Sequence, residues 1–474
     1  MDVLYDARLL HRPLSGLERV QRNMLRALAV DSRVRRLRAF VLHGTKAPAG
    51  LPARVELVPV HSTESMLAVL LGDDPPDVYH LTYFPDRNPR DLLLPIVAAA
   101  SVVEVHDAIL NRHPEYYPDR RAWGWYHDFV RRLIRSCDRL LIHSESARGE
   151  VERDLDGDAS IADLAPLAVD PALLQALPLE EVQERLRRLE VRGDYVLALG
   201  KDYPHKDHAT LFRAVATLPE LHVVCAGSRV WHRPGESSDE LCKSLGIGDR
   251  VRWIEGLDDH DVKALMQGAR CLAYPSREEG FGLPPVEAMA LGTPVVACAS
   301  MSIPEVCGDG AWFFAPGDHG EMAARLRAVL AGGARVRELV ERGRQRAASL
   351  SWERSADATV RCYERALAAA RAGNPSRPRL PANVRDVLAC VAASPHDDGR
   401  DLLAWTERCL QSERHLNAVE ADRQDILRRL NELERGLGQT LTEAHPPPAS
   451  PPARWSIRRR LRKIRAGIKR RLGE

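Results

Sequence analysis

The sequence predicts an α/β protein with two Rossmann-like domains that face each other across a cleft, followed by a helical C-terminal extension. Three observations support this prediction. The chain has 474 residues, more than one ordinary domain of about 150 residues requires. Short apolar runs alternate with longer amphipathic stretches, and this alternation occurs twice along the chain. Apolar strands that are each followed by a helix are typical of parallel sheets covered on both faces.

Eleven short apolar runs are candidate strands, five in the first half of the chain and six in the second. The first five are residues 3–5, 39–43, 78–81, 102–105 and 140–143. The next six are residues 195–199, 222–226, 251–254, 271–274, 294–297 and 312–314. Segments with helical periodicity, such as 209–218 and 262–269, lie between most of them. Two such units in succession predict two domains.

The domain boundary is expected between Val169 and Asp194, where the pattern becomes polar and helical. Residues 1–175 are therefore assigned to an N-terminal domain and residues 176–350 to a C-terminal domain. A helix at 351–372 is expected to cross back to the N-terminal domain.

The last hundred residues are expected to extend beyond the two domains. Residues 373–440 contain a linker and then, at 402–437, apolar side chains at spacings of three and four residues. Two interpretations stay open for this segment: an amphipathic helix that packs on the body, or a short coiled coil through which copies of the chain associate. Residues 441–474 consist of a proline-rich linker and a basic amphipathic tail.

Composition is typical of a soluble globular protein, since 45% of the residues are hydrophobic and 28% are charged. The longest nearly apolar run, residues 92–103, is shorter than the ~20 residues that a membrane-spanning helix needs. The N-terminus lacks the apolar stretch of a secretory signal peptide and carries Asp2, Asp6 and Arg8, so no signal peptide is expected there. The nine cysteines show neither CxxC pairs nor zinc-ligand spacing, and are expected to be reduced core residues of a cytoplasmic protein.

The basic residues are concentrated at the C-terminus. Residues 454–474 carry ten Lys/Arg and one Glu, a charge of +9, which leaves −7 for the rest because the whole chain carries +2. Apolar residues recur every three or four positions there, after Trp455. Such a helix is expected to lie on an anionic membrane surface, at the inner face of the cytoplasmic membrane. The alternatives are a solvated tail and a tail that binds nucleic acid. Nucleic-acid binding requires the charge but does not explain the regular apolar stripe.

The motif with the clearest chemistry follows the strand at 271–274. Gly280 and Gly282 leave the backbone bare just before a helix whose first turn suits Pro285. Free N–H groups and the positive end of the helix dipole form a phosphate site there. Glu279 and Glu287 cannot bind phosphate, because like charges repel, but they can accept hydrogen bonds from vicinal sugar hydroxyls. The alternative, that both are ordinary acids at a helix start, is the minor interpretation because they bracket this turn.

A second motif follows the strand at 195–199. Lys201 and Lys206 lie on the next loop, at the carboxyl end of the sheet, where α/β proteins bind ligands. A lysine acts there as a point charge for phosphate oxygens. Solvated surface lysines are the alternative interpretation.

The run EGFGLPPVEAMALGTPVVA, with residues 303–306 and 315–318, closely resembles the retaining glycosyltransferases of the GT-B fold, in the family that includes bacterial mannosyltransferases. The resemblance covers roughly residues 1–370. It implies that Glu279 contacts the hydroxyls of the donor sugar in a catalytic role and that Glu287 contacts the ribose. The remaining donor-binding positions that it implies are the backbone of Gly280, Phe281, Gly282 and Leu283, on the sugar and distal phosphate, and Lys201 and Lys206, on the pyrophosphate.

The first half of the chain resembles the same family at two points. Residues 15–20 resemble the glycine-containing loop that lies near donor and acceptor, with Gly16 as the matching glycine. His106 resembles the histidine that approaches the donor sugar from the acceptor-side domain, so it is the second candidate catalytic residue. Residues 144–146 match a further element, interpreted as structural.

The resemblance implies transfer of a hexose, with mannose as the expected sugar, from a nucleotide diphosphate sugar to a hydroxyl of a glycan or lipid-linked acceptor. The anomeric configuration is retained, and the pathway is cell-surface polysaccharide or glycolipid synthesis. No cofactor or metal is expected, because lysines and a helix end neutralise the leaving phosphate and no acidic metal cluster is evident. Two alternatives stay open: a GT-B-fold sugar-nucleotide epimerase, and a non-catalytic assembly subunit docked on the membrane.

Overall fold

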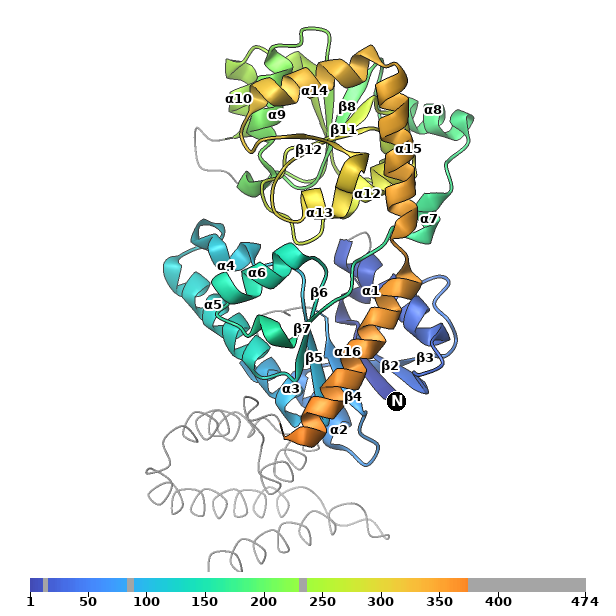
Figure 1. Cartoon of the computed structure of the whole chain (residues 1–474), viewed down its shortest axis with the longest axis vertical. Coiled ribbons are helices and arrows are strands. Elements are labelled where there is room, and N and C mark those ends of the chain that lie inside the picture. The colour runs from blue at the N-terminus through green and yellow to red at the C-terminus, as the bar shows by residue number, and fades with distance from the viewer. Residues whose placement is uncertain (12–15, 83–88, 230–236, 374–474) are drawn as a thin grey trace, which may run out of the picture. The chain divides into compact units, whose positions relative to one another are not determined.

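The computed structural model of the chain describes residues 1–11, 16–82, 89–229 and 237–373 (Figure 1). Met1–His61 and Pro76–Arg377 form one compact unit, and every contact discussed below lies within it. Helix α2 (Thr63–Leu71) belongs to a second unit. Over the described residues, no helix combines the length and the apolar character needed to cross a bilayer. The segment predicted at 402–437, both linkers and the basic tail lie outside the described residues.

The first sheet has seven parallel strands in the order β3-β2-β1-β4-β5-β6-β7. Their bounds are β1 (Asp2–Asp6), β2 (Arg36–Leu42), β3 (Val55–Val60), β4 (Val78–Leu81), β5 (Ala100–Val105), β6 (Arg139–Ile142) and β7 (Ala162–Leu164). All six residues of β5 are buried, as expected for a strand covered on both faces. Since the chain winds outward in both directions from the β1–β4 pair, the carboxyl ends of these two strands form a topological switch point.

The second sheet has six parallel strands in the order β10-β9-β8-β11-β12-β13. Their bounds are β8 (Tyr195–Leu199), β9 (His222–Ala226), β10 (Val251–Ile254), β11 (Cys271–Tyr274), β12 (Val295–Cys298) and β13 (Trp312–Phe314). Here the switch point lies between β8 and β11. The loop with Lys201 and Lys206 follows β8, and the loop with Glu279, Gly280 and Gly282 follows β11, so both predicted site motifs lie at this switch point.

The predicted fold class is confirmed, and all eleven predicted strands are present, six of them with the predicted bounds. The two strands that the sequence analysis missed are β3 and β7, which lie at the edges of the first sheet. β3 contains Glu56 and Pro59, and an edge position tolerates a proline because it has no second neighbour to bond. β7 has three residues, too few to show a pattern.

Helices lie between the strands in both halves of the chain. Those that precede β8 are α1 (Gly16–Val30), α3 (Leu93–Val97), α4 (Ile109–Arg112), α5 (Arg120–Arg135), α6 (Glu145–Arg153), α7 (Pro171–Leu174) and α8 (Leu179–Arg188). Those that follow β8 are α9 (His208–Ala216), α10 (Ser238–Ser244), α11 (Asp259–Gly268), α12 (Leu283–Ala290), α13 (Ile303–Cys307), α14 (His319–Ala331), α15 (Ala334–Ser349) and α16 (Trp352–Ala372).

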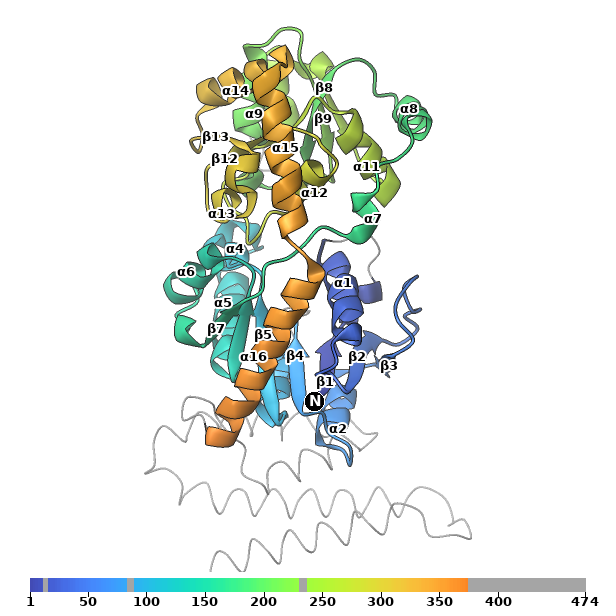
Figure 2. The same cartoon turned by 45° about the vertical axis from the view of Figure 1, so that its right-hand side comes forward.

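The long helix α16 returns to the first sheet and packs beside α1 and against β5 and β6 (Figures 1 and 2). The Trp352 indole N–H donates to the Val169 carbonyl at 3.0 Å, and the Tyr363 hydroxyl lies 2.7 Å from His80 Nδ1. We therefore use "first domain" for the first sheet with its helices and α16, and "second domain" for the second sheet with its helices. The seven cysteines among the described residues are all free and buried.

Candidate functional site

The loops after β8 and β11 meet at the switch point of the second sheet. Lys206 ends the short 3-10 turn Pro204–Lys206, and its Nζ lies 2.5 Å from Oε1 of Glu279. The Tyr274 hydroxyl donates to the same oxygen at 2.5 Å. Burial raises the pKa of Glu279, but the charge of Lys206 and the hydrogen bonds from Lys206, Tyr274 and Ser276 together outweigh burial, so the pKa of Glu279 lies below its usual value. Glu279 is therefore an ionised carboxylate at neutral pH.

The turn between Glu279 and α12 requires both of its glycines. A Cβ on Gly280 would lie 1.8 Å from the carbonyl oxygen of His106, so the backbones of the two domains touch there. Gly282 has a φ of +93°, in the left-handed region that favours glycine. The Ser302 hydroxyl donates to the carbonyls of Glu279 and Phe281 at 2.8 and 3.0 Å. These contacts fix the turn that precedes the helix.

The turn presents free backbone donors. Within the described residues, the N–H groups of Gly280, Phe281 and Gly282 have no hydrogen-bond acceptor. No side chain caps the start of α12, and Pro284 and Pro285 have no N–H to satisfy. Unpaired N–H groups at the positive end of a helix dipole bind anions, and phosphate in particular.

Glu287 lies on α12, and its side chain is 2% exposed. Its Oε1 lies 3.2 Å from NH1 of Arg19, a residue of α1 in the first domain. Its Oε2 is buried, and no hydrogen-bond partner for it exists among the described residues. Burial raises the pKa of Glu287, and Arg19 opposes that rise. Glu287 is thus a carboxylate with one oxygen paired and the other vacant.

His106 follows β5 in the first domain. Its carbonyl touches Gly280, and its imidazole Nε2 lies 3.0 Å from the carbonyl oxygen of Thr82, which follows β4. Burial lowers the pKa of His106, so the neutral imidazole is favoured. Because the Thr82 carbonyl can only accept, we assign the ring proton to Nε2, which leaves Nδ1 with a lone pair.

Behind His106 lies a carboxylate among imidazoles. Glu104 is 1% exposed; its Oε1 lies 2.7 Å from His143 Nε2 and 3.7 Å from His106 Nε2, and its Oε2 lies 3.4 Å from His80 Nε2. Burial raises the pKa of Glu104, but the neighbouring His106, His143 and His80 together outweigh burial and bring it well below its usual value. We call these four residues the Glu104 cluster.

Three members of the Glu104 cluster approach closely enough to hold a cation, since ligand atoms of Glu104, His106 and His143 lie within 4.8 Å of one another. Two of their ring nitrogens already face carbonyl oxygens, His106 Nε2 that of Thr82 and His143 Nδ1 that of Ala165 at 2.9 Å. A nitrogen that donates to a carbonyl has no lone pair for a metal. We therefore interpret these two nitrogens as hydrogen-bond donors to backbone carbonyls, and the absence of a metal requirement stays a prediction.

The structure brings together Lys206, Glu279 and the Gly280–Gly282 turn, with His106 against that turn. The Lys201 side chain is exposed, and among the described residues the lysine paired with Glu279 is Lys206. Gly16 is the exposed first residue of α1, and residues 12–15 before it lie outside the described residues. The Phe281 side chain is buried, and Leu283 begins α12.

Several residues to which the sequence analysis gave no part in binding or catalysis join the domains at this site. Glu278 accepts from His113 Nε2 at 2.7 Å and lies 3.3 Å from Arg112 NH2. The Ser144 hydroxyl, which caps α6, donates to the Gly280 carbonyl at 2.7 Å. The Glu305 carboxylate accepts from the backbone N–H of Glu145 at 2.9 Å. The segment at 144–146, interpreted as structural, thus holds the motif turn, and its signal was the serine N-cap.

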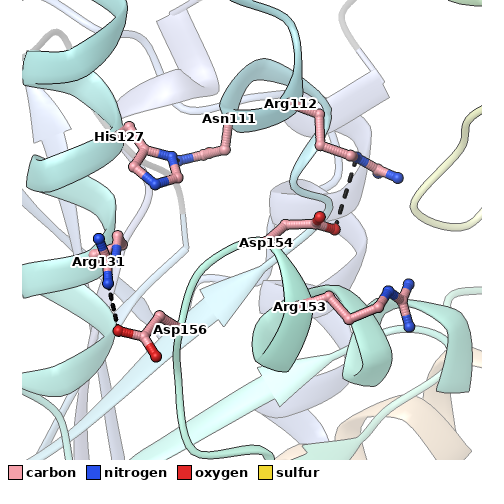
Figure 3. A pocket seen from close by; sticks show the side chains of 7 residues that line it. All are labelled: Asn111, Arg112, His127, Arg131, Arg153, Asp154 and Asp156. Atoms are coloured by element: carbon pink, nitrogen blue, oxygen red, sulfur yellow. Dashed lines mark hydrogen bonds and ion pairs between the residues drawn. The ribbon is translucent and has the colours of Figure 1, made fainter.

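A cavity of about 360 Å³ lies in the first domain near α4, α5 and the end of α6 (Figure 3). Its lining residues are Asn111, Arg112, His127, Arg131, Arg153, Asp154 and Asp156. Arg131 pairs with Asp156, and Arg112 Nε lies 3.7 Å from Asp154. None of the predicted site residues lines this cavity, and its charges are largely paired internally.

The chain is similar to known glycosyltransferases. Residues 183–346 match the family model described as glycosyl transferases group 1. The chain is 33% identical over 252 residues to an MMP alpha-(1->4)-mannosyltransferase of Mycolicibacterium hassiacum, an alignment that covers 52% of this chain and 59% of that protein. It is 26% identical over 387 residues to the O-antigen chain mannosyltransferase B of Escherichia coli. That alignment covers 77% of this chain and 100% of the relative.

Among solved structures, the chain is similar to Anabaena Alr3699/HepE in complex with UDP and glucose. The TM-score is 0.59 at 17% identity, and the match covers 76% of this chain and 98% of that chain. The chain therefore has the GT-B fold and resembles glycosyltransferases of group 1, mannosyltransferases among them.

Proposed function

We propose that the chain is a glycosyltransferase that transfers a hexose, expected to be mannose, from a nucleotide diphosphate sugar to a hydroxyl of a glycan or lipid-linked acceptor, with retention of configuration. One observation carries the proposal: an ionised Glu279–Lys206 pair adjoins the vacant N–H groups that precede α12. Both the matched family and the two mannosyltransferase relatives agree with it.

In the empty site, Lys206 and Glu279 neutralise each other. A nucleotide diphosphate sugar offers each a better partner, since its phosphates attract the ammonium and its sugar hydroxyls donate to the carboxylate. The N–H groups of residues 280–282 then face the phosphate next to the sugar. The complex of HepE with UDP and glucose supports a donor of this chemical class.

The reaction breaks the bond between the anomeric carbon and the leaving phosphate oxygen. The acceptor oxygen attacks from the same face, and its proton passes to an oxygen of the leaving phosphate. Lys206 and the backbone N–H groups stabilise the charge that develops on that phosphate. His106 lies on the opposite domain against Gly280, where its Nδ1 lone pair can accept from a sugar hydroxyl.

The acceptor side of the proposal includes the membrane. The basic tail at 454–474 brings the chain to anionic lipid, where lipid-linked glycans are extended. Flotation with anionic liposomes tests this part, with the full chain compared with a chain that ends at Ala453. The full chain is expected to float with the liposomes, and the shorter chain is expected to stay in the bottom fraction. Equal recovery of the two chains in the liposome fraction contradicts a role for the tail.

Transfer itself is tested by incubating the chain with GDP-mannose, UDP-glucose and dTDP-glucose, each with and without a glycan acceptor. Sugar is expected on the acceptor only when donor and acceptor are both present. An epimerase would instead convert the donor alone, and the relatives named above, all transferases by name, give no support to that alternative.

A further inference from the structure

The pair between Arg19 and Glu287 joins the two domains and has no role in the scheme above. Arg19 lies in the first turn of α1, and Glu287 lies on α12. Their NH1–Oε1 distance is 3.2 Å, with side chains 16% and 2% exposed. A carboxylate so deeply buried requires a cation or several donors to remain charged.

The Arg19–Glu287 ion pair leaves part of its hydrogen-bonding capacity unused. Glu287 Oε2 and Arg19 Nε are both buried, and neither has a hydrogen-bond partner among the described residues. A buried polar atom without a partner is costly, so such atoms point to a missing one. One vacant acceptor and one vacant donor on the same ion pair match a hydroxyl group, which can donate and accept at once.

We propose that Arg19 is a positioning residue of the donor site, which holds Glu287 ionised from the opposite domain so that its second oxygen accepts from a hydroxyl of the nucleotide sugar. This inference rests on the proposed function. Oε2 is buried in the empty state, so a local shift that keeps the Arg19–Glu287 pair must admit the hydroxyl.

The charges around Glu287 explain why a cation is needed there. The carboxylates of Asp170, before α7, and Asp259, on α11, both raise its pKa, in addition to the effect of burial. Tyr274, on β11, is uncharged at neutral pH because burial and carboxylates raise its own pKa. Arg19 opposes these effects. Without it, Glu287 takes up a proton at a higher pH and loses acceptor strength.

The test is calorimetric titration of the full chain across pH 6 to 9, with whichever of GDP-mannose and UDP-glucose binds the parent chain. Arg19→Gln is expected to bind about tenfold more weakly at pH 6.5 and to approach the parent at pH 9. Arg19→Lys keeps the charge and is expected to stay within about threefold of the parent throughout. A parallel pH profile for Arg19→Gln and the parent would overturn the proposal.

The matched control is Arg26→Gln, which removes the same charge from the same helix. Arg26 donates to the carbonyls of Ala49 and Gly50, away from Glu287. Its donor affinity is expected to equal that of the parent at every pH. A loss in Arg26→Gln equal to that in Arg19→Gln would mean that net charge, and not the Arg19–Glu287 pair, is responsible, which overturns the proposal.

Removing Arg19 alone leaves a buried carboxylate uncompensated and lowers the melting temperature, so a second variant keeps the proposal testable. In Arg19→Gln/Glu287→Gln both charges are absent. Its donor affinity is expected to equal that of Glu287→Gln, because Arg19 acts through Glu287. If the double variant instead loses donor affinity by the product of the two single-variant losses, Arg19 and Glu287 act independently and the inference is overturned. If the parent and Arg26→Gln bind neither sugar nucleotide, the proposed function itself fails and this inference with it.

Discussion

The two domains stabilise their buried carboxylates with different partners. Two carboxylates of the second domain lie against side chains of lysine or arginine: Glu279 against Lys206, and Glu287 against Arg19 of the first domain. In the first domain, Glu104 lies among three imidazoles. An imidazole can be neutral or charged, and burial favours the neutral form of His106, so Glu104 lies among groups without a fixed charge, unlike Glu279 and Glu287.

This difference matches the two roles that the site must perform. A donor with a diphosphate carries a fixed negative charge, and binding it requires cations that do not titrate. The acceptor hydroxyl must lose a proton during transfer, and proton chemistry is favoured by groups that titrate near the working pH. We therefore expect changes in the second domain to alter donor affinity, and changes around the Glu104 cluster to alter turnover and its pH dependence.

The largest effect is expected where the domains touch. In Gly280→Ala the added methyl group would lie 1.8 Å from the His106 carbonyl, so the domains must separate or the turn must shift. A displacement of about 1 Å at a reacting centre costs roughly a hundredfold in rate. Turnover with saturating donor measures this. Gly124→Ala, on α5, where nothing lies within 4 Å of the new methyl group, is the control and keeps parental turnover.

The next largest effect tests which lysine holds the donor. Lys206→Ala removes a charge-assisted hydrogen bond of about 1.5–3 kcal/mol and is expected to weaken donor binding by about tenfold to a hundredfold. Lys201→Ala removes the same charge from an exposed side chain and is expected to cost less. Calorimetric titration compares the two. If Lys201→Ala has the larger effect, the phosphate contact belongs to Lys201 and the assignment of Lys206 is wrong.

His106→Ala tests the first domain. Its effect is expected on turnover, by at least about tenfold, with donor affinity nearly unchanged, because the residue faces the site from the acceptor side. Steady-state kinetics at saturating donor, together with donor titration, separate the two quantities. Turnover within twofold of the parent would make His106 a structural histidine.

The sequence predicted the sheets and the site loops because their signals are local. Apolar runs identified the buried strands, and Gly280 and Gly282 predicted a turn with an exposed backbone before α12. The contacts of this segment with the first domain could not be predicted, because they join residues more than a hundred positions apart. Ser144 donates to Gly280 across 136 positions, and His113 reaches Glu278 across 165.

Two further residues carried no signal for a different reason. Arg19 is an arginine on a helix, and most such side chains are solvated. Glu104 is a charge within an apolar strand, and sequence alone does not show that it lies beside His80, on the neighbouring strand β4, and His143, directly after the neighbouring strand β6. Pairing between strands, and not the strands themselves, creates the Glu104 cluster.

The smallest effect concerns pH and the contact between the domains. The hydrogen bond to Glu278 raises the pKa of His113 above its ordinary value, and Glu115 adds to this. A histidine with a raised pKa stabilises the folded chain fully below its unfolded pKa of about 6.5, and that contribution is lost as the pH rises through the higher folded value. Because the pair is partly exposed, we expect about 0.5 kcal/mol.

The measurement is the melting temperature of the parent chain and of His113→Gln between pH 6 and pH 8.5. The parent is expected to lose a small part of its stability as the pH rises, and His113→Gln to lack that part of the slope, because glutamine keeps a hydrogen-bond donor for Glu278 without a charge. His127→Gln is the control: its histidine has a lowered pKa, caused by burial and by Arg131, and it makes no contact with Glu278. Parallel curves for the parent and His113→Gln would show that the contact between the domains does not depend on the charge of His113, and the comparison between the domains would then rest on the Glu104 cluster alone.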